Sequence, residues 1–287
     1  MAEWLILLIV VPAIVVPVVM LVGFSGCDVV WSVDEVKKTP PAIESAAGKN
    51  PSIITLTWKY GYQVQTFQFE RTNLPEETKE LFYAPSSPHD DVGRSPGTTY
   101  SYRVRAILTD GEEGDWSEPA RGTTPSFEPT FEASLINDEP EWQGYCLVQR
   151  LEAVRLSRSG TQIRLTIRAS SIGDASIDRI YISQPDAAGD PYDSAGDLKE
   201  VHSYVMVPAN TAVTLVPDVD FVLDESKPLL VAVDFSPVPL SAISYTDTVP
   251  QEAVGYWRLG AEAAVRDRSA GYQPENRIYL IEKIEVG

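Results

Sequence analysis

The sequence predicts an all-β protein preceded by a membrane helix. Three observations support this: an apolar N-terminal segment, short runs of alternating or β-branched residues along the remainder, and Gly, Pro, Asp and Ser between those runs. We expect a membrane segment over residues 1–27, a tether over 28–39, a β-sandwich over 40–125 and a second sandwich or jelly-roll-like β domain over 126–287.

The N-terminal segment spans residues 4–24 and contains no charged side chain. As a helix it would extend for about 30 Å, which is the thickness of the hydrocarbon core of a bilayer. A soluble helix of such uniform apolarity would have no polar face. The segment therefore predicts a membrane as one partner of the chain.

A cysteine follows this segment in Phe24-Ser25-Gly26-Cys27. The motif resembles the lipobox of bacterial lipoproteins, which implies that Cys27 is lipid-modified and becomes the mature N-terminus. Two features depart from that pattern, because Met1-Ala2-Glu3 carries no positive charge and the apolar run exceeds the usual length of a signal peptide. A lipoprotein-type signal and an uncleaved anchor both stay open, and we expect a membrane-anchored, extracytoplasmic protein of the cell envelope or surface.

The first β domain shows clean period-2 alternation. In residues 53–58, Ile54, Leu56 and Trp58 share one face of a predicted strand. In residues 99–108, Tyr100, Tyr102, Val104 and Ala106 are predicted to point inward. Both segments are typical of half-buried strands.

The segment Pro96-Gly97-Thr98-Thr99-Tyr100-Ser101-Tyr102-Arg103-Val104-Arg105-Ala106 resembles the late-strand signature of fibronectin type III domains. Trp58 matches the early core tryptophan of that family, Tyr100 its tyrosine corner and Trp116 the segment after its glycine turn. The resemblance covers residues 40–125 and implies a seven-stranded sandwich without disulfides. It implies no activity, and without an Arg-Gly-Asp tripeptide no binding residue is carried over.

The second β domain is predicted from its strand-like runs. The run at 229–233 is continuously apolar, which predicts a central strand covered on both faces. The segment 255–268 is ambiguous, and its middle is compatible with a helical turn. The predicted strands are residues 145–151, 162–169, 179–183, 203–207, 212–215, 229–235 and 277–286.

The charge is strongly acidic, with a formal net value of −18. Most of this excess lies in residues 126–287. An acidic surface repels phosphate backbones, which argues against a nucleic-acid partner. Solubility alone explains such a surface, and a bound divalent cation or a basic partner is the sharper alternative.

An acidic loop is the segment most suggestive of chemistry. Asp186, Asp190, Asp193 and Asp197 alternate with Gly and Pro, and their oxygens are hard ligands suited to Ca²⁺. The spacing is not that of an EF-hand. The alternative is a surface loop whose aspartates form turn hydrogen bonds, so a structural calcium ion is a hypothesis and no other cofactor is expected.

Aromatic residues are frequent in the second domain and suit either a core or a carbohydrate-binding face. Cys146 lies in an apolar run and is predicted to be a small buried hydrophobe. Cys146 with His202 is a conceivable nucleophile and base, but no local motif supports that pair. The aromatic candidates are Trp142, Tyr145, Tyr181, Tyr192, Tyr204, Tyr256, Trp257 and Tyr272.

The sequence favours a non-catalytic binding or adhesion protein of the envelope. No Gly-x-Ser-x-Gly, His-Glu-x-x-His or phosphate-binding glycine loop is present. The C-terminal β domain is expected to contact a carbohydrate or protein partner. Two alternatives stay open: a structural component of a virion or surface assembly, and a hydrolase with a fibronectin-like accessory module.

Overall fold

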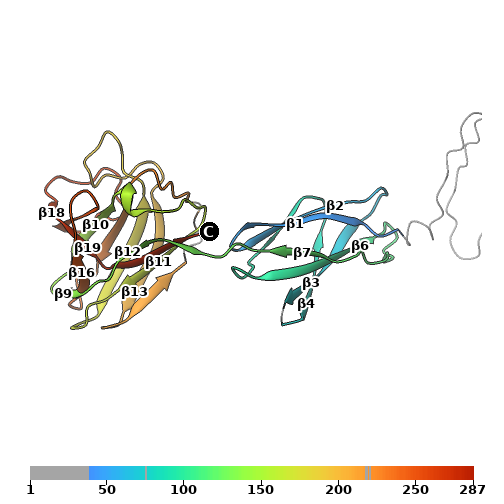
Figure 1. Cartoon of the computed structure of the whole chain (residues 1–287), viewed down its shortest axis with the longest axis horizontal. Helices are drawn as coiled ribbons and strands as arrows, with labels where there is room; N and C mark the ends of the chain where they lie inside the picture. Colours follow the sequence, from blue (N-terminus) through green and yellow to red (C-terminus); the bar gives the residue numbers. More distant parts are fainter. Residues whose placement is uncertain (1–38, 75, 217–218, 220) are drawn as a thin grey trace, which may run out of the picture. The chain divides into compact units, whose positions relative to one another are not determined.

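The computed structural model describes residues 39–287 apart from 75, 217–218 and 220 (Figure 1). The predicted membrane segment, Cys27 and all but the last residue of the tether lie outside the described residues. Within the described part, no helix has the length and apolarity to cross a membrane. The described residues form β-strands and one short 3-10 helix, which confirms the all-β prediction.

The chain divides into two compact units. Of the described residues, one contains 39–46, 55–89 and 100–122, and the other contains 47–54, 90–99 and those from 123 to 287. The sheets divide the described chain in sequence order. Two sheets contain only strands β1 to β7, and three sheets contain only strands β8 to β20.

Strands β1 to β7 form a sandwich of two sheets, with the orders β1-β2-β5 and β4-β3-β6-β7. This arrangement of three strands against four is consistent with the fibronectin type III-like fold that the resemblance implied. The strands are β1 (Ala42–Asn50), β2 (Ile53–Lys59), β3 (Thr66–Leu74), β4 (Thr78–Ala84), β5 (His89–Val92), β6 (Thr99–Ile107) and β7 (Ala120–Thr123).

The core of this sandwich follows the predicted alternation. In β6 every second residue from Tyr100 to Ala106 is buried, and in β2 Ile54, Leu56 and Trp58 are buried, as predicted. The Trp58 ring packs edge-on against Phe67 and Phe69, with centroid distances of 5.3 and 4.9 Å. Period-2 burial on both sheets therefore builds a dry interior.

The C-terminal strands form a second sandwich. A six-stranded sheet has the order β13-β12-β15-β10-β17-β18, a four-stranded sheet has the order β14-β11-β20-β8, and a small sheet has the order β19-β16-β9. The strands are β8 (Glu128–Glu132), β9 (Asn137–Glu139), β10 (Tyr145–Leu151), β11 (Ile163–Arg168), β12 (Ala175–Ser183), β13 (Lys199–Val207), β14 (Ala212–Leu215), β15 (Leu229–Phe235), β16 (Ile243–Asp247), β17 (Ala253–Leu259), β18 (Gln273–Glu275), β19 (Arg277–Tyr279) and β20 (Ile281–Val286), with the 3-10 helix η1 (Ala153–Arg155) after β10.

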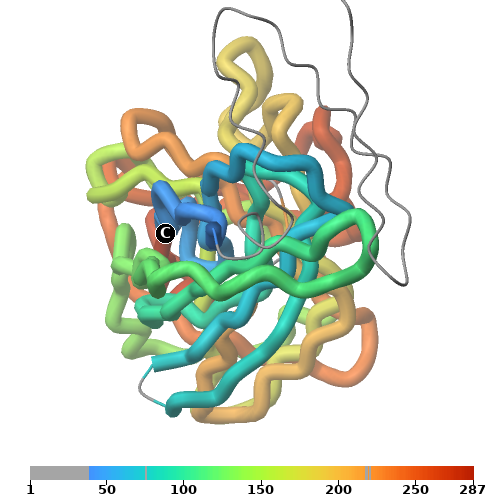
Figure 2. Tube along the Cα trace, turned by 90° about the vertical axis from the view of Figure 1, so that its right-hand side faces the viewer, coloured from blue at the N-terminus to red at the C-terminus, as the bar shows by residue number. Residues whose placement is uncertain are grey.

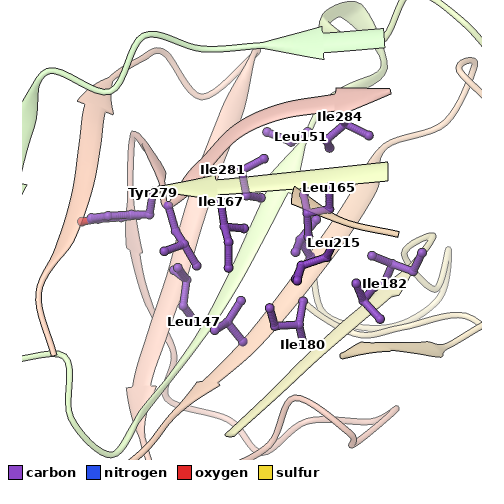
Figure 3. Close-up of a cluster of buried hydrophobic side chains, with 14 of the residues drawn as sticks. Leu147, Leu151, Leu165, Ile167, Ile180, Ile182, Leu215, Tyr279, Ile281 and Ile284 are labelled. Atoms are coloured by element: carbon purple, nitrogen blue, oxygen red, sulfur yellow. The ribbon is translucent and has the colours of Figure 1, made fainter. Parts of the chain in front are cut away.

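A single apolar core lies between the two larger sheets. Figure 3 shows Leu147 of β10 and Ile180 and Ile182 of β12 together with Leu165 and Ile167 of β11, all nearly inaccessible to solvent. Every residue of β15 is buried, which confirms the predicted central strand. Strand β15 pairs with β12 and β10, and β10 also pairs with β17, a strand far away in the chain. The colours of Figures 1 and 2 follow the residue numbers along the chain.

Two loops cover the outer face of the six-stranded sheet. Residues 184–197 and 260–272 supply Tyr192, Ala263 and Tyr272, which pack against Cys146 and Leu230 of the sheet. Arg268 holds the loops together, because it is only 5% exposed and donates to the backbone carbonyls of Tyr192 and Ala263. Burial lowers the pKa of the Arg268 guanidinium, while the carboxylates of Asp193 and Asp234 offset part of that effect.

Some predicted strand boundaries were wrong. The strands predicted at 179–183 and 203–207 begin earlier, at Ala175 and Lys199, because polar residues in their first halves hide the alternation. The strand predicted at 277–286 is broken at Leu280, whose φ of 59° turns the chain from one sheet to another. The ambiguous segment 255–268 is strand β17 up to Leu259 and then a loop.

A candidate ligand pocket in the C-terminal sandwich

The candidate site is a small pocket where the β9, β16 and β19 sheet meets the six-stranded sheet. Strands β9, β16, β18 and β19 gather on one side of the C-terminal sandwich (Figure 1). The cavity measures about 170 Å³. This is smaller than the roughly 300 to 1,000 Å³ of sites for drug-sized ligands, so it has room for one small ring. Its lining residues are Glu139, Pro140, Glu141, Trp142, Tyr145 and Trp257.

Three aromatic rings form the apolar wall of the pocket. Trp142 is 5% exposed and packs against Phe235 and Tyr279, with centroid distances of 5.4 and 5.1 Å. Tyr145 lies 6.1 Å from Trp142 and 5.7 Å from Trp257, in edge-on contacts with both. Tyr145 and Trp257 are half-buried and pack against the core from its margin. Their position follows from the alternation of β10 and β17, which places them on the core side at the strand ends.

Carboxylates form the polar wall. The indole Nε1 of Trp257 donates to Glu275 over 3.2 Å, which fixes the orientation of the ring. Arg277 contacts Glu139 at 3.1 Å and Glu275 at 2.8 Å. Burial raises the pKa of the Glu139 carboxyl above its ordinary value, and the charge of Arg277 offsets part of this rise.

Gln149 of β10 positions the strand that carries Arg277 and Tyr279. This fully buried amide accepts a hydrogen bond from the Tyr279 backbone N–H at 2.8 Å and donates to the Arg277 carbonyl at 3.0 Å. Gly255, opposite Gln149 in β17, leaves space for the Tyr279 ring, since a Cβ there would lie 2.6 Å from a ring carbon. A buried amide and a glycine therefore hold β19 against the six-stranded sheet.

The predicted aromatic residues are divided between core and surface. Trp142, Tyr192 and Tyr272 are buried, whereas Tyr204 is 80% exposed on β13. Only Trp142, Tyr145 and Trp257 of that set line the pocket. Glu139, Glu275 and Arg277 were not singled out from the sequence, because folding brings together residues more than a hundred positions apart.

The predicted aspartates have protein partners in the acidic loop. Asp193 accepts from the Arg268 backbone N–H at 2.8 Å, and Asp186 accepts from the Ala188 N–H at 2.9 Å. Asp190 accepts from the Tyr192 hydroxyl at 3.0 Å, and Asp197 accepts from the Gln184 N–H at 3.2 Å. Throughout the described residues, no group of three or more His, Cys, Asp or Glu side chains is placed to hold a metal ion.

Cys146 and His202 are not brought together. Cys146 is fully buried on β10, as predicted for a small hydrophobe, and burial raises the pKa of its thiol to about 12. His202 is exposed on β13, and two strands separate β13 from β10. That spacing corresponds to about 14 Å, which is beyond hydrogen-bond reach.

The three residues that carried the resemblance to fibronectin type III domains lie in the core and on the outer face of the N-terminal unit. Trp58 and Tyr100 are 4% and 3% exposed. Trp116 is half-buried, and the guanidinium groups of Arg103 and Arg105 lie 4.8 and 4.5 Å from its ring. The cations occupy the ring, so Trp116 differs from the aromatic residues of the pocket.

Comparison with solved structures finds similar chains, and the three described here have low identity to this one. The chain resembles a two-domain fibronectin type III segment of chicken tenascin (12% identity, TM-score 0.25, covering 85% of this chain and 99% of that one). It also resembles the cysteine protease and lectin-like domains of Cwp84, a surface layer associated protein of Clostridium difficile (9%, TM-score 0.35, 78% and 59%). A third is an α-L-rhamnosidase from Dictyoglumus thermophilum (10%, TM-score 0.28), of which the chain spans 29% while 79% of this chain is covered.

No protein-family model and no curated protein matches the chain. At these identities and TM-scores the likeness carries no argument about ligand or activity. The fibronectin-like assignment of the N-terminal unit rests instead on its own strand order and on its sequence motifs.

Proposed function

We propose that the chain is a non-catalytic, envelope-anchored binding protein whose C-terminal β domain binds carbohydrate through the pocket. The observation that carries this proposal is a ring-sized cavity with aromatic and carboxylate walls, lined by Trp257, Tyr145 and Glu139. Aromatic rings pack against the C–H face of a sugar, and carboxylates accept hydrogen bonds from its hydroxyl groups. These are the two kinds of contact that a sugar ring requires.

Glycan-array binding and titration of the full-length chain test this proposal. Trp257→Ala is expected to weaken binding of a positive glycan about tenfold or more, because it removes one wall of the pocket. Trp116→Ala is the matched control, since it removes a half-buried tryptophan from the N-terminal unit, and it should leave affinity unchanged. Far-ultraviolet circular dichroism establishes that both variants are folded.

A variant that keeps an aromatic ring guards against misfolding. In Trp257→Phe the ring face is largely retained, but the hydrogen bond to Glu275 is lost. We expect weaker binding and a smaller ligand-induced change in tryptophan fluorescence, to which only Trp142 of the pocket then contributes. Equal affinities for wild type, Trp257→Ala and Trp257→Phe would refute the pocket as the site. Release of shorter oligosaccharides during the titration would refute the non-catalytic part of the proposal.

The membrane anchor is proposed from the sequence of residues 1–27. Intact mass spectrometry of membrane-extracted protein distinguishes the two ways of anchoring. A mass that lacks residues 1–26 and includes acyl chains identifies Cys27 as a lipidated N-terminus, whereas an unprocessed chain identifies a spanning anchor. A full-length chain that stays in aqueous solution without detergent would contradict both.

An assembly component is the second candidate, and an apolar loop end favours it. Val238 and Leu240 are 77% and 73% exposed, and Leu259 is 66% exposed. Leu259 and Pro237 both lie within 4 Å of the position that a Cβ on Gly144 would take, so the loop and the end of β17 adjoin. Sedimentation velocity tests this candidate: a defined oligomer that dissociates in Val238→Ser/Leu240→Ser would support assembly, and a monomeric wild type would refute it.

A further inference from the structure

The charge around the pocket restricts the class of ligand that the pocket is expected to bind. Glu139 and Glu141 line the cavity, and Glu275 accepts a hydrogen bond from the indole of Trp257. The one guanidinium in this cluster, that of Arg277, contacts Glu139, Glu275 and Asp247 at 3.1, 2.8 and 3.3 Å. It also lies 4.3 Å from the ring of Tyr245. Three carboxylates therefore contact one guanidinium, Glu141 on the cavity wall adds a fourth negative charge, and the cluster keeps a negative excess.

The aromatic rings of the pocket also favour a positively charged ligand. Trp142 and Tyr145 meet at an interplanar angle of 64°, and Tyr145 and Trp257 meet at 75°. Rings at such angles form the walls of a corner and do not make one flat platform. The negative faces of aromatic rings attract cations, and walls of this kind bind ammonium groups. Rings and carboxylates together disfavour an anionic ligand.

The backbone presents one of these carboxylates on the pocket rim. Glu141 has a φ of 71°, in the left-handed region that is strained for a non-glycine residue. Its side chain is exposed and lines the cavity beside Pro140 and Trp142. Residues held in this conformation gather at ligand sites. This strained residue therefore lies beside the aromatic rings and the other carboxylates of the pocket.

We infer that the pocket binds an amino sugar with a free, protonated amine, in preference to a neutral, N-acetylated or acidic sugar. The inference rests on the proposed carbohydrate-binding function and specifies its substrate class. The sugar ring packs against the aromatic wall, and its ammonium group lies between that wall and the carboxylates of Glu139 and Glu141. An N-acetyl group removes the charge, and a uronic acid reverses it.

Calorimetric titration of the full-length chain with four oligosaccharides of equal length tests this inference. The four are built from glucosamine, N-acetylglucosamine, glucose and galacturonate. We expect the glucosamine oligomer to bind about tenfold more tightly than the glucose oligomer. Added salt should reduce that advantage, because ions screen partly exposed charges. The galacturonate oligomer should bind most weakly.

Charge-neutralising variants separate a specific site from general attraction to an acidic protein. Glu141→Gln is expected to reduce the preference for glucosamine over glucose at least about threefold, because the amide keeps a hydrogen-bonding group for the sugar but carries no charge to attract the amine. The matched control is Glu225→Gln, which removes the same charge from an exposed position outside the pocket. Equal losses in the two variants would overturn the inference, since they indicate non-specific ionic attraction.

The remaining outcomes distinguish the inference from the proposed function. Tight binding of the glucose or N-acetylglucosamine oligomer, as strong as that of glucosamine, would overturn the inference and leave carbohydrate binding intact. Preference for galacturonate would overturn it in the same way. If no oligosaccharide binds, the proposed function itself fails.

Discussion

The two units place arginine differently with respect to their aromatic rings. In the N-terminal unit Arg103 and Arg105 stack on Trp116, and Arg103 is held in place by two hydrogen bonds to Glu70 at 2.9 and 2.8 Å. In the C-terminal unit Arg277 is held by carboxylates and stacks on Tyr245, which is not among the residues that line the cavity.

This difference decides which aromatic surface is able to take a ligand. A guanidinium on a ring occupies the face that a sugar would need. In the pocket, the indole of Trp257 is fixed through its edge, by a hydrogen bond to Glu275. Both tryptophans are half-buried, so exposure alone does not separate them. The two tryptophans differ in the group that contacts each ring: arginine lies on the face of Trp116, and a carboxylate binds the edge of Trp257.

The largest expected effect concerns the buried arginine of the C-terminal unit. Arg268→Ala should lower the free energy of unfolding by about 3 kcal/mol, because several carbonyls and the Ser194 hydroxyl lose a charged donor inside the fold. Arg266→Ala, whose side chain is 56% exposed beside Asp186, should cost less than about 1 kcal/mol. Urea titrations followed by circular dichroism measure both.

Similar losses from the two variants would contradict this prediction. They would mean that loops 184–197 and 260–272 are held mainly by their apolar contacts with the sheet, such as those of Tyr192 and Tyr272. The buried arginine would then resemble the surface arginines of the N-terminal unit in its contribution. A loss confined to Arg268→Ala would sharpen the contrast.

The sequence predicted those parts of the fold whose burial leaves a periodic pattern. Strand β6 alternates and β15 begins with five apolar residues, and both were predicted with correct type and environment. Strand β9 is Asn-Asp-Glu, three polar residues paired along one edge of β16. It has no apolar face to reveal it. Local pattern is therefore informative only where a strand covers the core.

The sequence drew attention to the aromatic residues of the candidate site but not to its charged residues. Trp142, Tyr145 and Trp257 belong to a larger set of aromatic residues that composition draws attention to. Glu139 meets Arg277 only after β9 and β19 have paired with opposite edges of β16. No spacing in the sequence encodes that meeting. The pairing of rings with carboxylates, which gives the pocket its proposed selectivity, therefore follows from tertiary structure.

Two glutamates should give stability profiles of opposite sign with pH. Hydrogen bonds from Arg103 lower the pKa of the Glu70 carboxyl, so its stabilising effect is present above the ordinary glutamate pKa and is lost on acidification. Burial raises the pKa of Glu139, so that carboxyl favours the folded state at low pH and loses this contribution as pH rises through its folded pKa.

Unfolding titrations of Glu70→Gln and Glu139→Gln at several pH values test this pair. At neutral pH Glu70→Gln should be less stable than wild type by about 1 kcal/mol, and the difference should vanish in acid. Glu139→Gln should match wild type in acid and become relatively more stable as pH rises. Profiles of the same sign for both variants would show that the two arginine–glutamate contacts are equivalent, against the contrast between the units.

The smallest expected effect compares two glutamates in the left-handed region. Glu77 has a φ of 56° in the turn between β3 and β4, and Glu141 has a φ of 71° on the pocket rim. Glycine adopts this conformation without a Cβ clash, so Glu77→Gly and Glu141→Gly should each raise the free energy of unfolding by up to about 1 kcal/mol. Only Glu141→Gly should also weaken glucosamine binding. If neither variant is stabilised, the turns impose no strain. If both are stabilised and bind alike, Glu141 contributes nothing to the pocket.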